Sequence, residues 1–377
     1  MTQNESPLAS SVQVGAEQIA LLERLCNASA VSGDEGEVRR IVLEEVRPHA
    51  SSLVIAAVGN LLVTHAGSQE PADGGRLRVM LAAHMDEIGL MVTNDEGEGI
   101  FRFDTVGGID VRQLAGKPVW VGSEQIPGVI GAKPVHLTTP DERRHTITLD
   151  TLRIDVGPEN GGKVKVGDRA VFATSFSQLG PSIRAKALDD RLGVATLIEL
   201  VKHAPETVDL LAAFTVQEEV GLRGAKVAAY TFNPDLAVVL DSTPANDLPA
   251  WEESGGYETY QPVATAYNTR LGYGPAIYIA DRATLSDPRL VRWLADTAER
   301  NGIPYQFRQP GGGGTDAGAI HKQRLGIPSV SVSVPGRYPH TAASIARLSD
   351  WENTLKLVYA ALETLDPHIL AGERTAV

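Results

Sequence analysis

A histidine and two carboxylates follow an apolar run in the first quarter of the chain. The run is LRVMLAA, residues 77–83, and it is typical of a buried strand. His84, Asp86 and Glu87 come directly after it. Polar residues of these types at the end of a core strand could hold a metal ion or carry out acid–base chemistry.

Other apolar runs also lead to carboxylates or histidine. LLAAFTVQ is followed by two glutamates, LAVVL by an aspartate, and PSVSVSV leads through PGRYPH to a histidine, whereas two adjacent aspartates stand where a loop enters a predicted helix. In the same order, these residues are Glu218 and Glu219, Asp241, His340, and Asp189 and Asp190. Because ligands of open α/β sheets gather at the carboxyl ends of the strands, we expect five chain segments to bring these groups to one edge of one sheet.

The set has a chemical interpretation. Histidine and carboxylate supply nitrogen and oxygen ligands, which suit zinc, cobalt or manganese. A two-metal site needs a bridging carboxylate, and two ions roughly 3.5–4 Å apart can activate a water molecule and polarise a carbonyl. It also needs a base that does not bind metal. Glu218 and Glu219 could supply a base and a ligand if the strand ends before them, because neighbours inside a strand point to opposite faces.

Each residue taken alone has a simpler explanation. His84 could be a hydrogen-bonded core histidine, and the two glutamates a solvated pair. The aspartates at 189 and 190 could cap a helix, and Asp241 could begin an Asx turn. The occurrence of all of them at successive strand ends favours a metal site.

Helices and strands must position these groups. Residues 16–29 carry apolar residues on one helical face, and the segment SGDEGEVRRIVLEEV predicts a second helix that begins with a capping box of Ser32 and Glu35. After residue 185, apolar strands alternate with helices. This alternation predicts an α/β fold with a mostly parallel sheet that helices cover on both faces.

The pattern changes between residues 91 and 173. Short candidate strands there are broken by glycine, proline and aspartate, with no convincing helix between them. Such a segment is typical of a small β-barrel or sandwich. We therefore expect residues 1–90 and 174–377 to form an α/β catalytic domain, into which residues 91–173 are inserted as a β-rich domain.

Composition argues against several classes of protein. The 377 residues are 43% hydrophobic, and 47 acidic against 34 basic residues give a net charge of −13 without a basic stripe, so no nucleic-acid partner is expected. No apolar stretch of about 18 residues and no N-terminal secretory pattern is found, so no membrane partner is expected. The single cysteine, Cys26, excludes a disulfide framework and favours a cytoplasmic location.

Six motifs, in order along the chain, resemble those of the M42 family of dinuclear metallo-aminopeptidases, also called TET aminopeptidases. They are AAHMDEIGLMV, KALDDRLG, TVQEEVGLRGA, VVLDSTP, GGGGTDAGAIH and VPGRYPHTAAS. The resemblance covers nearly the whole chain, and relatives are described as glutamyl aminopeptidases or as endoglucanases. It implies a zinc-exopeptidase sheet flanked by helices, and a metal-dependent hydrolase that removes N-terminal residues from short peptides.

The resemblance also implies which residues bind metal. Two divalent ions are expected per subunit, zinc or cobalt, with manganese as a further possibility. One ion would be held by His84, Asp189 and Asp241. The other would be held by Asp189, Glu219 and His340, so that Asp189 bridges the pair.

Further roles are implied by the same matches. Asp189 rather than Asp190 is expected to be the bridge because, in this clan, the bridging aspartate is followed by a residue joined through a cis peptide bond. Glu218 corresponds to the general base. Asp86 corresponds to the carboxylate that orients His84.

In relatives the β-rich insertion builds dimers, and dimers assemble into a hollow tetrahedral dodecamer that short peptides can enter. The resemblance therefore implies a homo-oligomer. Departures from the family pattern occur at Ile109, Val135 and Thr341. None of them is an expected metal ligand, and the first two lie in the insertion.

The glycine tract GGGG and the residues after it permit two interpretations. One is a turn ahead of a helix that begins near Thr315. The other is a backbone that approaches the substrate closely, as glycine permits. The resemblance favours the second, with Gly313, Gly314, Thr315 and Asp316 lining the substrate site. The histidines at 136 and 321 are expected to be structural or at the surface.

Three other functions stay open. A glycoside hydrolase would use a carboxylate pair, but two histidines would be idle and aromatic residues are only 5% of the chain. A non-catalytic assembly protein would be expected to have lost a ligand or the base. A metallo-deacylase or other amidohydrolase of the same clan would differ only in its substrate. The side-chain preference and the native metal do not follow from the sequence.

Overall fold

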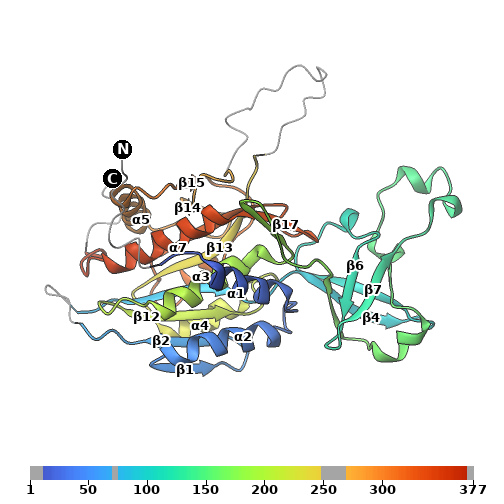
Figure 1. The fold of residues 1–377 in the computed structure, drawn as a ribbon, viewed down its shortest axis with the longest axis horizontal. Coiled ribbons are helices and arrows are strands. Elements are labelled where there is room, and N and C mark those ends of the chain that lie inside the picture. Colours follow the sequence, from blue (N-terminus) through green and yellow to red (C-terminus); the bar gives the residue numbers. More distant parts are fainter. Residues whose placement is uncertain (1–11, 70–74, 248–268, 372–377) are drawn as a thin grey trace, which may run out of the picture.

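The computed structural model describes residues 12–69, 75–247 and 269–371. An 11-stranded sheet with helices on both faces forms the larger part of the molecule, and a closed six-stranded barrel projects from one end of it (Figure 1). The predicted α/β fold with an inserted barrel is confirmed. No helix in the described ranges is long and apolar enough to cross a membrane.

The helices of the α/β part differ in length and burial. They are α1 (Ala16–Asn27), α2 (Gly36–Val46), α3 (Leu188–Lys202), α4 (Arg223–Phe232), α5 (Pro288–Asn301), α6 (Ala317–Ile320) and α7 (Leu348–Glu363). Helix α3 is buried along almost its whole length, because it packs against the central strands while α1, α2 and α7 cover it.

The sheet is parallel in its centre and largely antiparallel around it, although β15 pairs parallel with β14. Its strands are β1 (Ser52–Ile55), β2 (Leu61–His65), β3 (Arg78–His84), β10 (Ser177–Leu179), β11 (Ser182–Ala185), β12 (Asp209–Thr215), β13 (Leu236–Pro244), β14 (Ala276–Tyr278), β15 (Gln306–Arg308), β16 (Ser329–Arg337) and β17 (Ser344–Arg347). Strands β12, β3, β13 and β16 lie side by side and all run parallel. Strands β2, β14 and β17 pair antiparallel with this central group.

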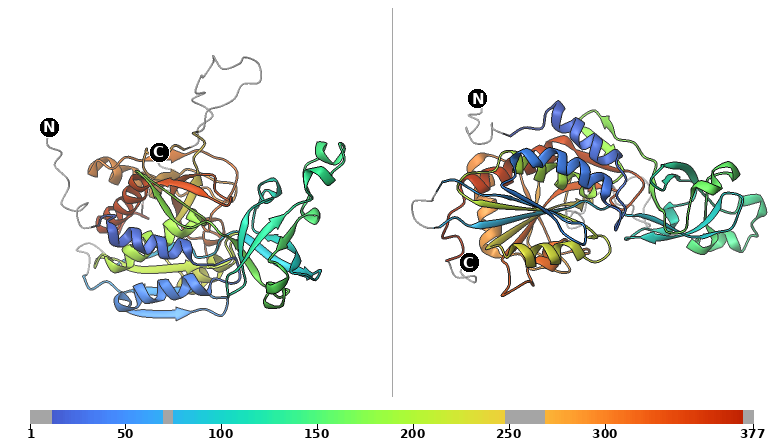
Figure 2. Two further views of the ribbon diagram at one scale, coloured as in Figure 1. Left: turned by 45° about the vertical axis from the view of Figure 1, so that its right-hand side comes forward. Right: turned by 90° about the horizontal axis from the view of Figure 1, so that it is seen from below.

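Alternate residues of the central strands pack into two different cores. Val79 and Leu81 of β3 belong to the core that includes residues of α1, α2, α3, α5 and α7, whereas Met80 and Ala82 belong to the core that includes residues of α4 and α6. Figure 2 shows the two helical layers on opposite faces of the twisted sheet. The near-continuous apolar runs in the sequence arise because both faces of these strands are covered.

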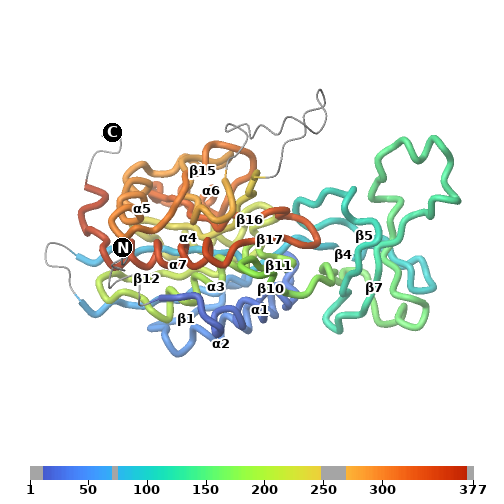
Figure 3. Tube along the Cα trace, turned by 45° about the horizontal axis from the view of Figure 1, so that its top comes forward, coloured from blue at the N-terminus to red at the C-terminus, as the bar shows by residue number. Residues whose placement is uncertain are grey.

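The barrel is inserted between β3 and β10. It contains β4 (Gly89–Asp95), β5 (Ile100–Val106), β6 (Pro118–Val121), β7 (Ile126–Gly131), β8 (Arg153–Asp155) and β9 (Arg169–Phe172), and it closes in the order β4-β5-β8-β7-β6-β9. It has a hydrophobic core of its own, built around residues such as Phe101 and Ile130. In the tube view it stands clear of the helices of the α/β part (Figure 3). The division into a catalytic and an oligomerisation domain stays a prediction.

The predicted capping box at the start of α2 is wrong. The helix begins at Gly36, with Glu35 at the N-cap position and no side-chain cap. The Ser32 hydroxyl instead donates to the Asp86 carboxylate at 2.6 Å, and the Glu35 carboxylate accepts the Gly33 N–H at 2.6 Å. An ionised carboxylate is a stronger hydrogen-bond acceptor than a neutral group. The Ser32 hydroxyl therefore bonds to Asp86 instead of taking part in a helix cap.

Candidate metal centre

The central parallel strands bring the expected groups to one edge of the sheet. Thr215, the last residue of β12, is paired with His84, the last residue of β3. Glu218 and Glu219 follow the end of β12, so their side chains need not point to opposite faces as neighbours inside a strand do. Asp241 lies inside β13 rather than after it, because that strand continues to Pro244.

Asp189 stands between the two histidines. Its Oδ1 lies 3.2 Å from Nε2 of His84, and its Oδ2 lies 3.5 Å from Nε2 of His340. The two oxygens of one carboxylate therefore face two different imidazoles. This is the arrangement that a carboxylate bridging two cations requires.

Two further carboxylates lie near the histidines. Oδ1 of Asp241 lies 3.9 Å from Nε2 of His84, and Oε2 of Glu219 lies 3.4 Å from Nε2 of His340. Nδ1 of His340 lies 2.8 Å from the carbonyl oxygen of Gly108, which connects the site to the segment after β5. Each histidine thus has the Asp189 carboxylate and one further carboxylate within 4 Å of its Nε2.

Asp190 lies in the same cluster but has different partners. Its carboxylate accepts the backbone N–H of His84 at 3.3 Å and that of Gly193 at 2.9 Å. A Cβ atom at position 193 would lie 2.4 Å from these oxygens, so a larger residue there would displace the Asp190 carboxylate. The Asp189–Asp190 peptide bond is cis. Potential ligand atoms within 4.8 Å of one another occur in two groups, which are His84, Asp189 and Glu219, and His84, Asp190 and Asp241.

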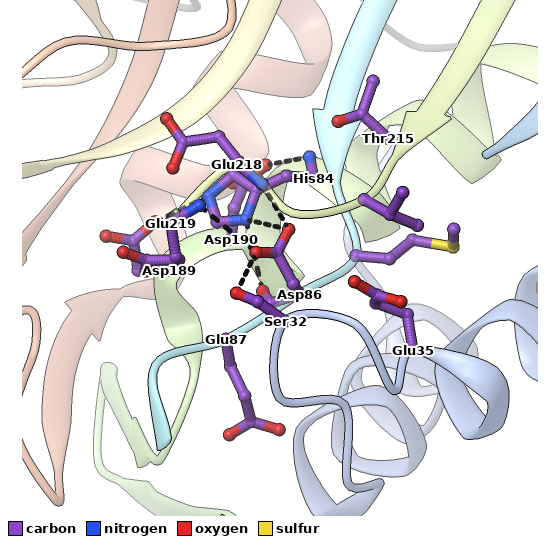
Figure 4. Close-up of polar contacts among 12 residues, drawn as sticks. Ser32, Glu35, His84, Asp86, Glu87, Asp189, Asp190, Thr215, Glu218 and Glu219 are labelled. Atoms are coloured by element: carbon purple, nitrogen blue, oxygen red, sulfur yellow. Dashed lines mark hydrogen bonds and ion pairs between the residues drawn. The ribbon is translucent and has the colours of Figure 1, made fainter. Parts of the chain in front are cut away.

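Asp86 is buried beneath the histidine and accepts several hydrogen bonds. Its oxygens take the backbone N–H groups of Glu218 at 3.0 Å and Glu219 at 3.2 Å, besides the Ser32 hydroxyl (Figure 4). Nδ1 of His84 lies 3.2 Å from the carbonyl oxygen of Asp86 and 3.5 Å from its carboxylate. Burial opposes the ionisation of Asp86, but His84 and these donors outweigh it and hold its pKa below the usual range.

Glu218 lines a cavity of about 720 Å³ beside the histidines. Within the described ranges, no side chain or backbone group forms a hydrogen bond or ion pair with its carboxylate, which points away from Asp86 (Figure 4). Burial raises its pKa well above the ordinary value, and the neighbouring carboxylates of Asp316 and Glu219 raise it further. A carboxyl group in such surroundings is suited to accept and return a proton.

The remaining groups are also strongly perturbed. Burial and the Asp189 carboxylate raise the pKa of Glu219 to about 7. Burial opposes protonation of His340, but Asp189 and Glu219 outweigh it and raise its pKa to about 10. Burial raises the pKa of Asp241 well above its usual range. So many buried carboxylates with few cationic partners favour occupation by divalent cations, which would replace the protons.

The four residues expected to line the substrate site differ in whether they line the cavity. Gly313 and Gly314 line the cavity, with Gly312 beside them. Thr315 and Asp316 are 2% and 1% exposed and lie behind this wall, hydrogen-bonded to Ser331 and Thr215 respectively. The expected contact of Thr315 and Asp316 with the substrate cavity is therefore not seen.

Some residues of the site were not anticipated from the sequence, and others lie apart from it. Ser32 was interpreted as a helix cap, and no motif drew attention to Arg308, a buried side chain that lines the cavity. His136 is exposed beyond the barrel strands. His321 ends α6 and contacts the carbonyl oxygen of Ala317 at 2.7 Å, away from the candidate ligands.

Comparison with known proteins places the chain in a family. The sequence pattern of the M42 glutamyl aminopeptidases matches residues 59–357. A lysyl aminopeptidase of Pyrococcus furiosus is 29% identical, over 92% of this chain and 97% of its own length. The solved structure of the aminopeptidase APDkam598 from Desulfurococcus kamchatkensis is 35% identical, with a TM-score of 0.85 over 94% of this chain and 96% of that one.

A second solved structure bears on assembly. The TET1 peptidase of Pyrococcus horikoshii, described as able to form a tetrahedron or a large octahedral shell, is 35% identical. The alignment covers 92% of this chain and all of that one, with a TM-score of 0.77. The motifs, the fold and the matched family pattern agree, and the chain belongs to the M42 family of aminopeptidases, hydrolases that act at the N-terminus of peptides.

Proposed function

We propose that this protein is a dinuclear metallo-aminopeptidase that removes N-terminal residues from short peptides. The observation that supports it most is the position of Asp189, whose two oxygens face His84 and His340 separately. The donor set of imidazole nitrogens and carboxylate oxygens fits zinc, cobalt or manganese. The buried carboxylates of Glu219 and Asp241 have raised pKa values, because burial and neighbouring carboxylates outweigh the effect of the histidines.

We propose the two ligand sets that the family resemblance implies. His84, Asp189 and Asp241 would hold one ion, and Asp189, Glu219 and His340 the other. When bound, such a pair polarises the scissile carbonyl and makes water a stronger acid. We assign the bridge to Asp189 rather than Asp190, because two backbone N–H groups already occupy the Asp190 carboxylate.

Glu218 is the proposed general base. Its carboxylate faces the cavity without a hydrogen-bonding partner in the described chain, so it is available to the attacking water. It takes a proton from that water and later gives it to the leaving amine. Asp86 holds the backbone of Glu218 and Glu219 and thereby fixes where both side chains begin. The backbone of Gly313 and Gly314 lies where the substrate would pass.

We further propose that the protein is a homo-oligomer, built from dimers and assembled into a tetrahedral dodecamer. The likeness to the TET1 peptidase of Pyrococcus horikoshii supports this assembly. The barrel is the proposed contact between subunits, since it has its own core and projects from the α/β part. A cytoplasmic location, with Cys26 reduced and buried, completes the proposal.

The test is a panel of aminoacyl anilides assayed before and after metal removal. The protein is stripped with a chelator and reloaded with zinc, cobalt or manganese. We expect activity on free aminoacyl anilides to vanish and return, and N-acetylated anilides to be resistant throughout. Activity only on the acetylated series would instead indicate a deacylase. Activity on glucans that survives chelation would indicate a glycosidase, and no activity with metal bound would indicate a non-catalytic protein.

A further inference from the structure

An arginine lies in the wall of the candidate active-site cavity. Arg308, the last residue of β15, is 4% exposed and lines the same cavity as His84 and Glu218. Its Nε donates to the Thr243 hydroxyl at 3.0 Å, and one terminal nitrogen donates to the carbonyl oxygen of Gly312 at 2.7 Å. The other terminal nitrogen has a long contact of 3.5 Å to the carbonyl oxygen of Ala280.

These partners are all uncharged. No carboxylate in the described ranges lies within ion-pair distance of the Arg308 guanidinium. A guanidinium carries five N–H groups, and the three contacts leave two of them without a protein acceptor among the described residues. A buried charge is normally paired, because removing it from water is costly. The pocket therefore contains a cationic group suited to receive an anion.

The orientation of the guanidinium is fixed. Its central carbon lies 4.4 Å from the ring centroid of Tyr278, in a cation–π contact. Tyr278 is itself buried, and burial raises its pKa, so its ring stays a neutral phenol. A planar cation held by a ring on one side and by hydrogen bonds at its edge is oriented for bidentate hydrogen bonding to a carboxylate.

The distance of Arg308 from the proposed metal ligands is also informative. Thr243, which accepts its Nε–H, stands two residues after Asp241 on β13. Residues two apart on a strand face the same side, roughly 6.5–7 Å from each other. Both line the cavity. The guanidinium thus lies two residues along β13 from the proposed metal ligand Asp241. A short acidic side chain would reach it from a residue whose amino group is held at the proposed metal site.

We infer that Arg308 is a specificity residue that binds a substrate carboxylate, namely the side chain of an N-terminal glutamate or aspartate. The inference rests on the proposed function, since it assigns the side-chain preference of that same site. A lysine side chain would place a second cation against Arg308, and an aliphatic one would leave its free N–H groups unpaired. The C-terminal carboxylate of a dipeptide has the same chemistry and is the other source to be tested.

The experiment compares Arg308→Met with the wild-type protein on glutamyl, aspartyl, leucyl and lysyl anilides, all loaded with the same metal. We expect the wild type to prefer the two acidic substrates. We expect Arg308→Met to lower the ratio of kcat/KM for glutamyl over leucyl anilide by about 10- to 100-fold. Arg308→Lys keeps the charge but loses the planar pair of N–H groups that can bind both oxygens of a carboxylate, so it should have an intermediate ratio.

Arg324→Met is the matched control. Arg324 also stacks on a tyrosine, with its central carbon 3.7 Å from the ring centroid of Tyr230, but it is exposed and does not line the cavity. This variant should leave the ratio unchanged. A second arm compares Leu-Gly with Leu-Gly amide. Arg308→Met could lose activity on Leu-Gly but not on Leu-Gly amide, with an unchanged ratio of kcat/KM for glutamyl over leucyl anilide. That result would overturn the assignment and show that Arg308 binds the C-terminal carboxylate of the peptide.

Two other outcomes separate this inference from the proposed function. Wild-type protein that prefers leucyl or lysyl anilide, or equal losses on glutamyl and leucyl anilide in Arg308→Met, would refute the role of Arg308 while the aminopeptidase stands. The wild-type panel decides this even if Arg308→Met does not fold. Failure of the metal-loaded wild type to hydrolyse any anilide would refute the proposed function itself.

Discussion

The carboxylate of Asp86 accepts the backbone N–H of Glu218 at 3.0 Å, across 132 positions of sequence. The same carboxylate accepts the N–H of Glu219 at 3.2 Å. One buried residue on the loop after β3 therefore fixes the backbone of both the proposed base and a proposed ligand. The nearest oxygen of Asp86 to the His84 ring is its carbonyl, so support of the two glutamates is a role distinct from orienting the histidine.

Asp86→Asn should lower kcat by about 10- to 100-fold. The amide presents one NH₂ where a carboxylate oxygen now accepts an N–H, so Glu218 or Glu219 loses its anchor. Ser32→Ala is the milder control, since it removes one donor from Asp86 and leaves both backbone contacts in place. Steady-state kinetics with metal content measured in parallel would test this. An unchanged kcat in Asp86→Asn would contradict it.

Glu218→Gln should keep both metal ions and lose about 10²- to 10⁴-fold in kcat. The amide has nearly the shape of the carboxylate but cannot take a proton from water. Metal content by elemental analysis separates this variant from one that has lost a ligand. Gln217→Ala, a change at the neighbouring position, should retain most of the activity. Full activity of Glu218→Gln would rule out its role as the base.

Asp189→Ala should lose both metal ions as well as activity, because one carboxylate serves both sides of the site. Asp190→Asn is the informative partner, since Asp190 accepts N–H groups from His84 and Gly193. It should lower stability yet retain metal at saturating concentrations. Two tightly bound ions in Asp189→Ala, measured after gel filtration, would show that Asp189 is not the bridge.

Strand periodicity carried much of what the sequence predicted. The apolar runs of β3, β12 and β16 have covered faces on both sides, so their ends could be located and the polar residues after them assigned to one edge. Asp241 was placed after its strand, whereas β13 continues to Pro244. Asp241 pairs with Ser333 in the middle of β16, yet its carboxylate still lies with the other candidate ligands, 3.9 Å from Nε2 of His84.

Long-range partners could not be predicted. Ser32 precedes a glutamate by three positions, which favours a helix cap locally, but its hydroxyl meets Asp86 some 54 positions away. Arg308 belongs to no motif, and its burial depends on the pairing of β14 with β15 and on the Tyr278 ring. Such contacts depend on which distant segments become neighbours in the fold, and local sequence patterns do not indicate this.

Glu87→Gln should destabilise the protein by about 3–5 kcal/mol. The Glu87 carboxylate pairs with Lys186 at 2.7 Å and Arg191 at 3.0 Å, and all three side chains are buried. Without the Glu87 carboxylate, two cations remain unpaired in the core near the candidate metal centre. Adding Lys186→Met should recover part of the loss, because one of the unpaired charges is then removed. Urea unfolding of the metal-free proteins checks both, and equal stability of Glu87→Gln and wild type would contradict the expectation.

Metal uptake by the stripped protein should weaken as the pH falls. Burial and Asp189 raise the pKa of Glu219 to about 7, and Asp189 and Glu219, against the effect of burial, raise that of His340 to about 10. Both groups must lose their protons to bind metal. Between pH 7 and 10 His340 is the protonated one of the two, whereas below pH 7 Glu219 is protonated as well. For each unit by which the pH falls, the apparent dissociation constant should therefore rise at least about tenfold above pH 7, and by a larger factor below it.

Isothermal titration of the stripped protein with zinc, at pH 6 to 8 and in two buffers of different ionisation enthalpy, measures both the affinity and the protons released. His340→Ala removes one of the displaced protons and should flatten the slope of affinity against pH. Cys26→Ser is a suitable control, since Cys26 is buried in α1 and is not among the candidate ligands. An affinity independent of pH, or uptake without proton release, would mean that the cluster of Asp189, Glu219 and His340 does not bind the metal.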